Sequence, residues 1–270
     1  MRTKLVALSI SGVLAVTAIA VTSPQATSKP KPYVALVVGE SGGFVMPEYN
    51  FSRLPRVVLY SDGRMFARSD VMTAQYPGPA VQTILTKSAG GSVSKIINAV
   101  YNAKLGDSTF KWGYPGVADV NNTDVYSKVS AKAKAKQVSV YAISFTGPGL
   151  TKKQVSARTK ASVLLNDLQA FSNKYVLTKS LPTSWVSNRW AYQVSEGTSN
   201  EFTTIQDWVG NPLTDRVSCA VLSADASKQL VTLLPSINQE TLFRSNDKLW
   251  KVTLRPLFPH ETGCASLGYK

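Results

Sequence analysis

One short stretch of the sequence has the residue types of a catalytic nucleophile. Gly39-Glu40-Ser41-Gly42-Gly43 follows an apolar, β-branched run at residues 33–38. It matches G-x-S-x-G, the strand-to-helix turn that exposes the nucleophilic serine of many hydrolases. His260 is the one histidine of the chain, and it completes the order Ser, Asp, His of a catalytic triad. One hypothesis is therefore a serine hydrolase in which Ser41 is the nucleophile and His260 the general base.

The residues around Ser41 favour a turn instead. A nucleophile elbow needs a helix directly after it, but residues 44–50 (FVMPEYN) contain a proline and show no helical period. Only about 15 residues of a processed chain would precede Ser41, too few for the strands that flank such a nucleophile. His260 lies four residues before Cys264, in the C-terminal part of the chain. We therefore predict that Ser41 is a turn residue and that the protein is not an enzyme.

Other catalytic or cofactor chemistry has little support in the sequence. One histidine and two cysteines 45 positions apart do not make a zinc-ligand pattern. Asp62-Gly63 lacks the acidic ladder of a calcium loop, and no glycine-rich nucleotide motif is present. Carboxylate pairs for glycoside hydrolysis could be drawn from any of the 16 acids, so no pair is specific. We expect no metal and no cofactor.

The N-terminus has the layout of a secretory signal peptide. Arg2 and Lys4 precede the uncharged apolar run 5–21, and small and polar residues follow. We predict cleavage between residues 20 and 26. The alternative is a membrane anchor, but the run is short for a bilayer core of ~30 Å. With no second long apolar run, we expect a secreted, extracellular chain without a transmembrane span, and association with the cell envelope stays open.

The two cysteines fit this compartment. Exported proteins commonly pair an even number of cysteines. We therefore predict a disulfide between Cys219 and Cys264; the alternative is two free thiols in a reducing compartment.

Positive charge is concentrated in one part of the sequence. The formal net charge is +14, or +12 without Arg2 and Lys4, and residues 87–160 hold eleven Lys and one Arg against three Asp, a net of +9. Such a field attracts polyanions, so we predict an anionic cell-wall polymer or acidic polysaccharide as partner. The alternative is that this charge only keeps the protein in solution. The candidate contacts are Lys128, Lys132, Lys134, Lys136, Lys152 and Lys153.

Other partners are less well indicated. Lys132, Lys134 and Lys136 would share one face of a strand, but they also suit a solvated hairpin tip that resists edge pairing. Nucleic acid is not expected, because the chain is exported and has no aromatic-basic motif. No feature identifies a protein partner. A third hypothesis is an extracellular inhibitor or partner-binding module that presents Trp185, Trp190 and Trp208.

Hydrophobic periodicity predicts an alternation of strands and helices. Asp62-Gly63 predicts a hairpin between 55–60 and 64–69. A strand at 81–88, a helix from Ser92 to Gly106, and a hairpin of 123–129 with 137–145 follow. Thr151 and Gln154 form a capping box for a second helix. The C-terminal part predicts a strand at 217–222, a helix capped by Ser223 and ended by Pro235, and a hairpin of 241–244 with 249–257.

The order strand, helix, hairpin thus occurs twice, at 81–145 and 217–257. We predict an α+β fold in which helices pack on antiparallel sheets, with two β-α-β-β-type units. The expected organisation is a signal peptide (1–26), a polar lead-in (27–32), an N-terminal α+β unit (33–175), a Trp-containing linker or crossover (176–214) and a C-terminal α+β unit (215–270).

Several segments together resemble a known group of proteins. They are FSRLPRVVLYSDGRMF (51–66), YPGPA (76–80), VADVNNTDV (117–125), QVSVYA (137–142), CAVL (219–222) and WKVTLRPLFPHETGC (250–264). They resemble secreted or lipid-anchored actinobacterial proteins of uncharacterised function, over most of the processed chain. The resemblance implies an envelope or extracellular setting and no particular activity. No cysteine ends the apolar run, so we expect free secretion. The leading prediction is a secreted, non-enzymatic protein that binds polyanionic envelope material through its basic region.

Overall fold

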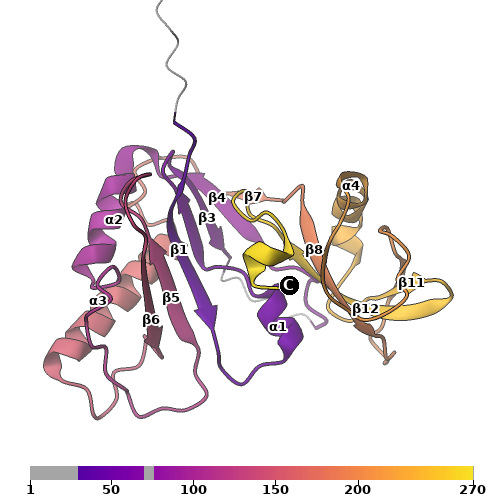
Figure 1. Ribbon diagram of the computed structural model, residues 1–270, viewed down its shortest axis with the longest axis horizontal. Coiled ribbons are helices and arrows are strands. Elements are labelled where there is room, and N and C mark those ends of the chain that lie inside the picture. Colours follow the sequence, from indigo (N-terminus) through magenta and orange to yellow (C-terminus); the bar gives the residue numbers. More distant parts are fainter. Residues whose placement is uncertain (1–29, 70–75, 270) are drawn as a thin grey trace, which may run out of the picture. The chain divides into compact units, whose positions relative to one another are not determined.

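Two β-sheets and four α-helices make up the described part of the chain (Figure 1). The computed structural model describes residues 30–69 and 76–269. The predicted signal peptide and residues 27–29 of the polar lead-in lie outside these residues. From Pro32 onward the chain clusters as one unit. The predicted α+β class, with sheets that are mainly antiparallel, is confirmed.

The larger sheet has seven antiparallel strands in the order β6-β5-β1-β2-β3-β4-β7. Its strands are β1 (Val34–Ser41), β2 (Val57–Tyr60), β3 (Arg64–Arg68), β4 (Ile84–Ser88), β5 (Asn122–Ser127), β6 (Lys136–Tyr141) and β7 (Thr183–Trp185). Both predicted hairpins are confirmed. In the first, Gly63 adopts a φ of 90° at the turn, which favours glycine because it has no Cβ.

The smaller sheet has five strands in the order β10-β8-β12-β11-β9. Its strands are β8 (Trp190–Glu196), β9 (Ile205–Asp207), β10 (Val217–Val221), β11 (Leu242–Ser245) and β12 (Lys248–Pro256). Only the β9–β11 pair is parallel. α4 (Ala224–Leu233) packs on this sheet, and the hydroxyl oxygen of Ser223 accepts a hydrogen bond from the Ala226 amide, as the capping prediction requires.

The predicted disulfide between Cys219 and Cys264 is confirmed. It joins β10 to the short 3-10 helix Cys264–Leu267 near the C-terminus. Phe51 of α1 (Pro47–Ser52) packs in the same cluster, edge-on against Tyr269.

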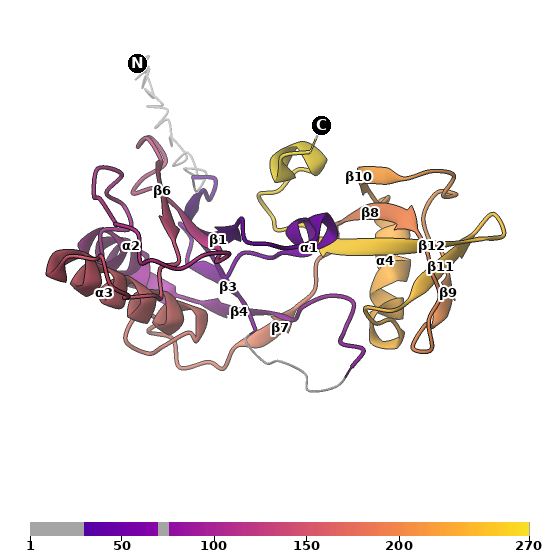
Figure 2. The same cartoon turned by 90° about the horizontal axis from the view of Figure 1, so that it is seen from below.

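Helices α2 (Val93–Asn102) and α3 (Lys152–Gln169) cover one face of the larger sheet (Figures 1 and 2). The Thr151 hydroxyl accepts from the Gln154 amide and the Gln154 side chain accepts from the Thr151 amide, so the predicted capping box is confirmed. The apolar stripes of both helices are buried against the sheet. These buried residues include Ile96, Ile97, Val100, Ala161, Leu164, Leu165 and Leu168.

Arg158 is buried completely inside this helix–sheet layer. Its guanidinium donates to four backbone carbonyls, those of Trp112 (3.1 Å), Gly113 (2.8 Å), Tyr141 (3.0 Å) and Ala142 (2.8 Å). Burial lowers the pKa of this guanidinium, and the carbonyl dipoles take the place of its hydration shell. Arg158 therefore connects α3, the end of β6 and the loop before β5.

The opposite face of the larger sheet is covered in part by the C-terminal segment. Phe258 packs against Phe66 and stacks on Trp185 with ring centroids 5.4 Å apart. The segment is held by a buried ion pair of 2.6 Å between Arg255 of β12 and Glu261. The second Glu261 oxygen accepts from the Phe258 amide, so this carboxylate fixes the loop that carries His260.

The end of α2 and the existence of α1 differ from the prediction. α2 does not run to Gly106. Lys104 takes the left-handed φ of 67° instead, and the amide of buried Leu105 donates back to the Val100 carbonyl. This is a Schellman ending, in which burial of the apolar residue after the turn outweighs the strain in a lysine. α1 was not predicted at all, because its six residues are too few to show a helical period.

Residues 176–214, which we expected to be a linker or crossover, supply three strands. β7 is the edge strand of the larger sheet, and β8 lies inside the smaller sheet. The two predicted strand–helix–hairpin runs exist in chain order as β4-α2-β5-β6 and β10-α4-β11-β12. In space, β1, β2 and β3 separate β4 from β5, and β8 separates β10 from β12. Strands from elsewhere in the sequence thus complete both sheets.

We expect Arg158→Met to lower the free energy of unfolding by about 3 kcal/mol or more, because it leaves four buried carbonyls without their donors. Urea denaturation of the purified chain measures this change. Ser156→Ala is the matched control, since Ser156 is exposed on the same helix, and it should change stability by less than about 0.5 kcal/mol. Equal stability of the two variants would contradict the role given to Arg158.

Candidate functional site

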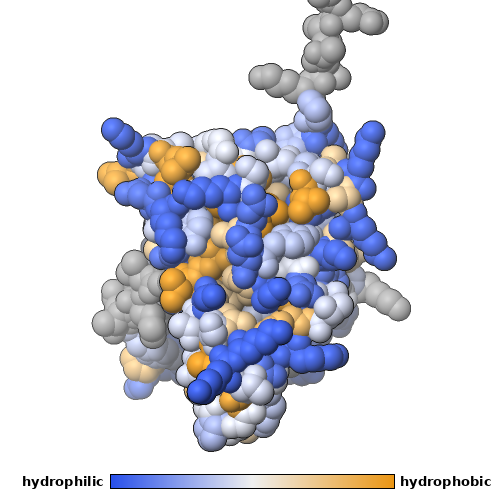
Figure 3. Space-filling model, turned by 90° about the vertical axis from the view of Figure 1, so that its left-hand side faces the viewer, coloured by the Kyte–Doolittle hydropathy of each residue, from blue (hydrophilic) through white to orange (hydrophobic). Residues whose placement is uncertain are grey.

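The outer surface of α2 and α3, here called the helical face, carries several exposed lysines. Figure 3 looks onto this side and shows long hydrophilic side chains around several apolar patches. Five exposed lysines on the two helices and on the loop between α2 and β5 form no ion pair among the described residues. They are Lys95, Lys111, Lys152, Lys153 and Lys160.

The acids near this face are already neutralised. Asp107 lies 3.8 Å from the amine of Lys104, and Asp167 lies 3.6 Å from that of Lys174. A hydrogen bond with Tyr175, together with Asp167, raises the pKa of the Lys174 amine, so this lysine stays charged at neutral pH. The remaining lysines therefore have no local counter-charge and attract external anions.

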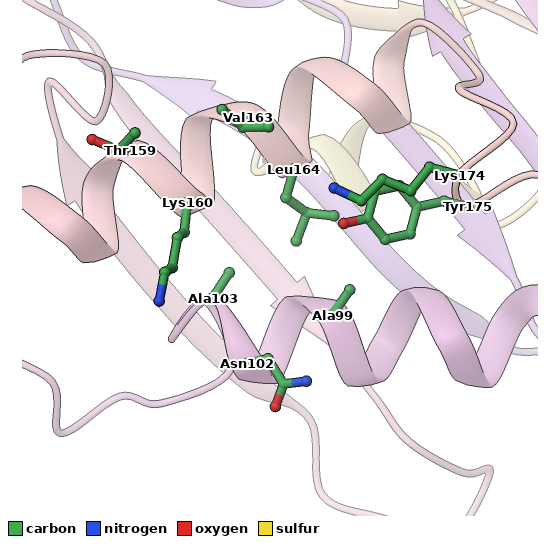
Figure 4. A pocket seen from close by; sticks show the side chains of 9 residues that line it. All are labelled: Ala99, Asn102, Ala103, Thr159, Lys160, Val163, Leu164, Lys174 and Tyr175. Atoms are coloured by element: carbon green, nitrogen blue, oxygen red, sulfur yellow. The ribbon is translucent and has the colours of Figure 1, made fainter.

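A groove of about 400 Å³ opens between α2 and α3. Figure 4 shows Ala99 and Ala103 on α2 facing Leu164 on α3. The groove exists because the side chains of Ala99 and Ala103, which lie one helical turn apart, are too small to fill the space between the helices. Lys160 reaches from α3 toward α2 at one end of the groove (Figure 4).

The other end of the groove is lined by Lys174 and Tyr175, which lie side by side in Figure 4. The Lys174 amine lies 5.1 Å from the centre of the Tyr175 ring. The groove thus combines an apolar floor with the Lys160 ammonium group at one end and with Lys174, which is paired with Asp167, at the other. It suits an anionic group attached to an apolar or sugar-like body.

The six lysines predicted to bind polyanions do not form one cluster. Lys132 and Lys134 lie in the turn between β5 and β6, so they do not share one face of a strand as expected; only Lys136 begins β6. The turn residues 131–135 do not pair across the hairpin, which removes the period-two geometry. Lys128 precedes this turn and places its amine 5.7 Å from the Tyr33 ring centre.

Lys152 and Lys153 lie at the other end of the sheet. β6 runs away from the basic turn for six residues, about 20 Å at ~3.3 Å per residue, before the chain turns into α3. Lys152 and Lys153 form the first turn of that helix. The basic turn nevertheless adjoins the start of α2, because Val129 and Val93 line one cavity of about 400 Å³. Lys152 and Lys153 therefore belong to the helical face, and the basic turn lies at the start of α2.

Ser41 and His260 are not brought together. Ser41 is the last residue of β1 and pairs with Asn122, so the prediction that it is a turn residue is wrong by one position, and the turn begins at Gly42. Val34, seven residues earlier, pairs with Tyr60. Seven strand residues span about 23 Å. Nδ1 of His260 lies 2.7 Å from the Tyr60 hydroxyl, near the opposite end of β1. A direct hydrogen bond from Ser41 to His260 is therefore not formed in this arrangement.

His260 is instead part of a contact between the C-terminal segment and the larger sheet. Its ring lies 5.8 Å from that of Tyr60, measured between ring centroids. Burial lowers the pKa of His260, and Glu261 and Arg255 act on it in opposite directions. Burial likewise raises the pKa of the Tyr60 hydroxyl. The neutral imidazole and the protonated Tyr60 hydroxyl share a hydrogen bond, which is a stabilising role.

The three tryptophans of segment 185–208 are packed rather than displayed. Trp190 is buried in the smaller sheet, and its indole N–H donates to the Ser187 carbonyl. Trp185 stacks on Phe258, and Trp208 packs edge-on against Phe243. These rings belong to the hydrophobic clusters, so the structure does not present them to a protein partner.

Sequence reasoning did not find the groove between α2 and α3. Ala99 and Ala103 were not assigned a role, and a pair of alanines on a helix usually marks close packing. Among residues 30–69 and 76–269, no group of three or more His, Cys, Asp or Glu side chains could hold a metal ion. Within the same residues, no helix is both long and apolar enough to cross a membrane.

Comparison with known proteins adds no relative. No protein-family description, no curated protein and no solved structure matches the chain. The resemblance to actinobacterial envelope proteins therefore stays a prediction.

We expect the single histidine to titrate below 6.5 in the folded chain. Because burial lowers the folded-state pKa, the unfolded chain binds more protons as the pH falls through 6.5, and the free energy of unfolding decreases there. Proton NMR of the imidazole in folded and urea-unfolded protein measures both pKa values. His260→Gln should remove this pH-dependent step. A folded-state pKa at or above 6.5 would show that the ring is not held neutral by burial.

Proposed function

We propose that this is an exported, non-enzymatic binding protein whose helical face binds an anionic polymer of the cell envelope or its surroundings. The N-terminal sequence and the disulfide support export, because disulfides persist in oxidising compartments. The observation that carries the binding proposal is the set of five exposed lysines without ion pairs among the described residues on and beside α2 and α3, of which Lys160 lines the α2–α3 groove.

The geometry favours an extended ligand over a compact one. The positive groups are spread from the β5–β6 turn along α2 and α3 instead of converging on one point, and α3 alone, with 18 residues, is about 27 Å long. A polymer with regularly spaced anionic groups matches this spacing. The groove between Lys160 and Lys174 gives one unit of such a polymer a concave seat.

Both phosphate and carboxylate polymers have the required chemistry. An ammonium group acts as a compact point charge and does not select a planar bidentate partner as arginine does. The surface is therefore expected to bind by charge density more than by the shape of the anionic group. Polyphosphate and alginate serve as probes for the two chemistries.

We expect Lys95→Glu/Lys160→Glu to weaken binding to both polymers about tenfold or more at low salt, since each lysine near an anionic surface contributes about 1 kcal/mol. The measurement is the salt concentration that elutes the chain from immobilised polyphosphate or alginate. Binding of the unmodified chain should weaken as salt screens the charges.

The matched control is Lys228→Glu/Lys248→Glu, which makes the same charge change at an exposed position of α4 and at the exposed first residue of β12. It should shift elution much less. If both double variants elute at the same salt concentration, only net charge matters and the helical face is not a binding surface. If the unmodified chain is not retained at low salt, the proposal is wrong.

We also expect Lys132→Glu/Lys134→Glu to weaken retention, because the basic turn adjoins the start of α2 and extends the same positive surface. Elution from the same columns tests this. Unchanged elution would show that the polymer site ends at α2 and excludes the turn.

A further inference from the structure

Three loops lie next to one another where β1 and β6 end and β5 begins. This group of loops is here called the loop edge. Ser41 at the end of β1 pairs with Asn122 at the start of β5, and Asn122 pairs with Tyr141 at the end of β6. The loops that follow or precede these residues therefore lie next to one another. They are residues 42–46, 113–121 and 142–151.

Large apolar side chains project from all three loops. Phe44 is 94% exposed and Met46 71% exposed, and Tyr114 and Phe145 are also exposed. Single exposed apolar residues are ordinary, but several gathered at one edge mark a surface that binds something. Packing within the described residues does not account for Phe44, because its side chain is left almost entirely in solvent.

Two of these aromatic side chains are linked through Tyr141 at the end of β6. Phe44 and Tyr141 line the same hollow of about 330 Å³, and Tyr141 stacks on Tyr114 with ring centroids 5.5 Å apart. The Tyr141 hydroxyl donates to the Val117 carbonyl. Tyr141 thus holds Tyr114 in place and forms one wall of the hollow beside Phe44.

The loops are held in place before any ligand binds. A Cβ on Gly147 would lie 2.5 Å from the Pro115 carbonyl oxygen, so the second and third loops touch through a position that only glycine fits. Gly43 has a φ of 80° and lies against Asn121, which turns the first loop outward beside the second. Arg158 ties the bases of the second and third loops to α3. A preformed surface binds with less ordering of its side chains and loops.

Positive charge flanks the apolar tips. Lys152 and Lys153 are exposed in the first turn of α3, directly after the third loop, and the Lys153 amine lies 5.7 Å from the Phe110 ring centre. Exposed Lys111 is next to them, since its carbonyl accepts from the Gln154 side chain at 3.0 Å. The three loops together contain one acid, Asp119.

We propose that the loop edge docks on a bilayer that contains anionic phospholipid. Aromatic and methionine side chains would enter the boundary between headgroups and acyl chains, while the three lysines contact lipid phosphates. This combination of apolar tips and adjacent lysines is the pattern of proteins that lie on a membrane without spanning it. A protein partner is less well matched, because Met46, Tyr114 and Phe145 lie outside the hollow and project from three separate loops.

The test is co-sedimentation of residues 27–270, which contain the whole unit that begins at Pro32, with two kinds of vesicle. One is equimolar phosphatidylglycerol and phosphatidylcholine, and the other is phosphatidylcholine alone. We expect binding to the first vesicle and at least tenfold weaker binding to the second. Phe44→Ser/Met46→Ser should lower binding to the anionic vesicle at least tenfold, and Lys152→Gln/Lys153→Gln should also lower it.

The matched apolar control is Leu181→Ser/Val186→Ser, at two exposed positions that flank β7. β7 is the outermost strand of the larger sheet on the side away from β6. It should leave vesicle binding unchanged. Circular dichroism of each variant shows that the fold is retained.

Several outcomes would overturn the proposal. They are the absence of binding to anionic vesicles, equal binding to both vesicles, and loss of binding in the lysine variant but not in the Phe44→Ser/Met46→Ser variant. If no vesicle binds but Phe44→Ser abolishes self-association in analytical ultracentrifugation, the loop edge contacts a second copy instead. The polymer-binding proposal is tested separately, because Lys95 and Lys160 are not part of the loop edge.

Discussion

The buried guanidinium of Arg158 is the interaction on which both proposed binding surfaces depend. It has no carboxylate partner and is satisfied by carbonyls from two separate loops. A buried charge without such compensation would be strongly unfavourable, so the loops before β5 and after β6 must close around it. This closure seats α3 against the sheet, which forms one wall of the α2–α3 groove. It also fixes the bases of two of the three loops that carry the exposed aromatic residues.

Features with local signals were predictable from the sequence. The Asp62-Gly63 turn, the capping box of Thr151 and Gln154, and the cysteine pair each depend on residues whose chemistry acts at short range or admits one pairing. The role of Arg158 was not predictable, because in the sequence it is one basic residue among twelve between 87 and 160. What distinguishes it is four acceptors that lie 16 to 46 positions away in the chain.

The missed strands and helix have a similar cause. β7 and β9 have three residues each, too few for an alternating pattern, and their existence depends on neighbours in the sheet rather than on their own propensity. The excess of lysine between residues 87 and 160 was visible in the sequence, but the positions of these charges on the folded surface were not. Only the fold shows that Asp107 and Asp167 neutralise Lys104 and Lys174, and that Lys132 and Lys153 belong to opposite ends of one sheet.

The two proposed surfaces reinforce each other because one helix carries both. Lys160 lies in the middle of α3 at the groove, and Lys153 lies in its first turn beside the loop edge. Because Arg158 lies between them and joins the helix to the sheet, the two surfaces keep a fixed relative position. Exposed lysines and shallow apolar contacts each bind weakly alone. Once one surface is bound, the other meets its ligand at a high effective concentration, so retention would be strongest where an anionic polymer lies next to an anionic bilayer.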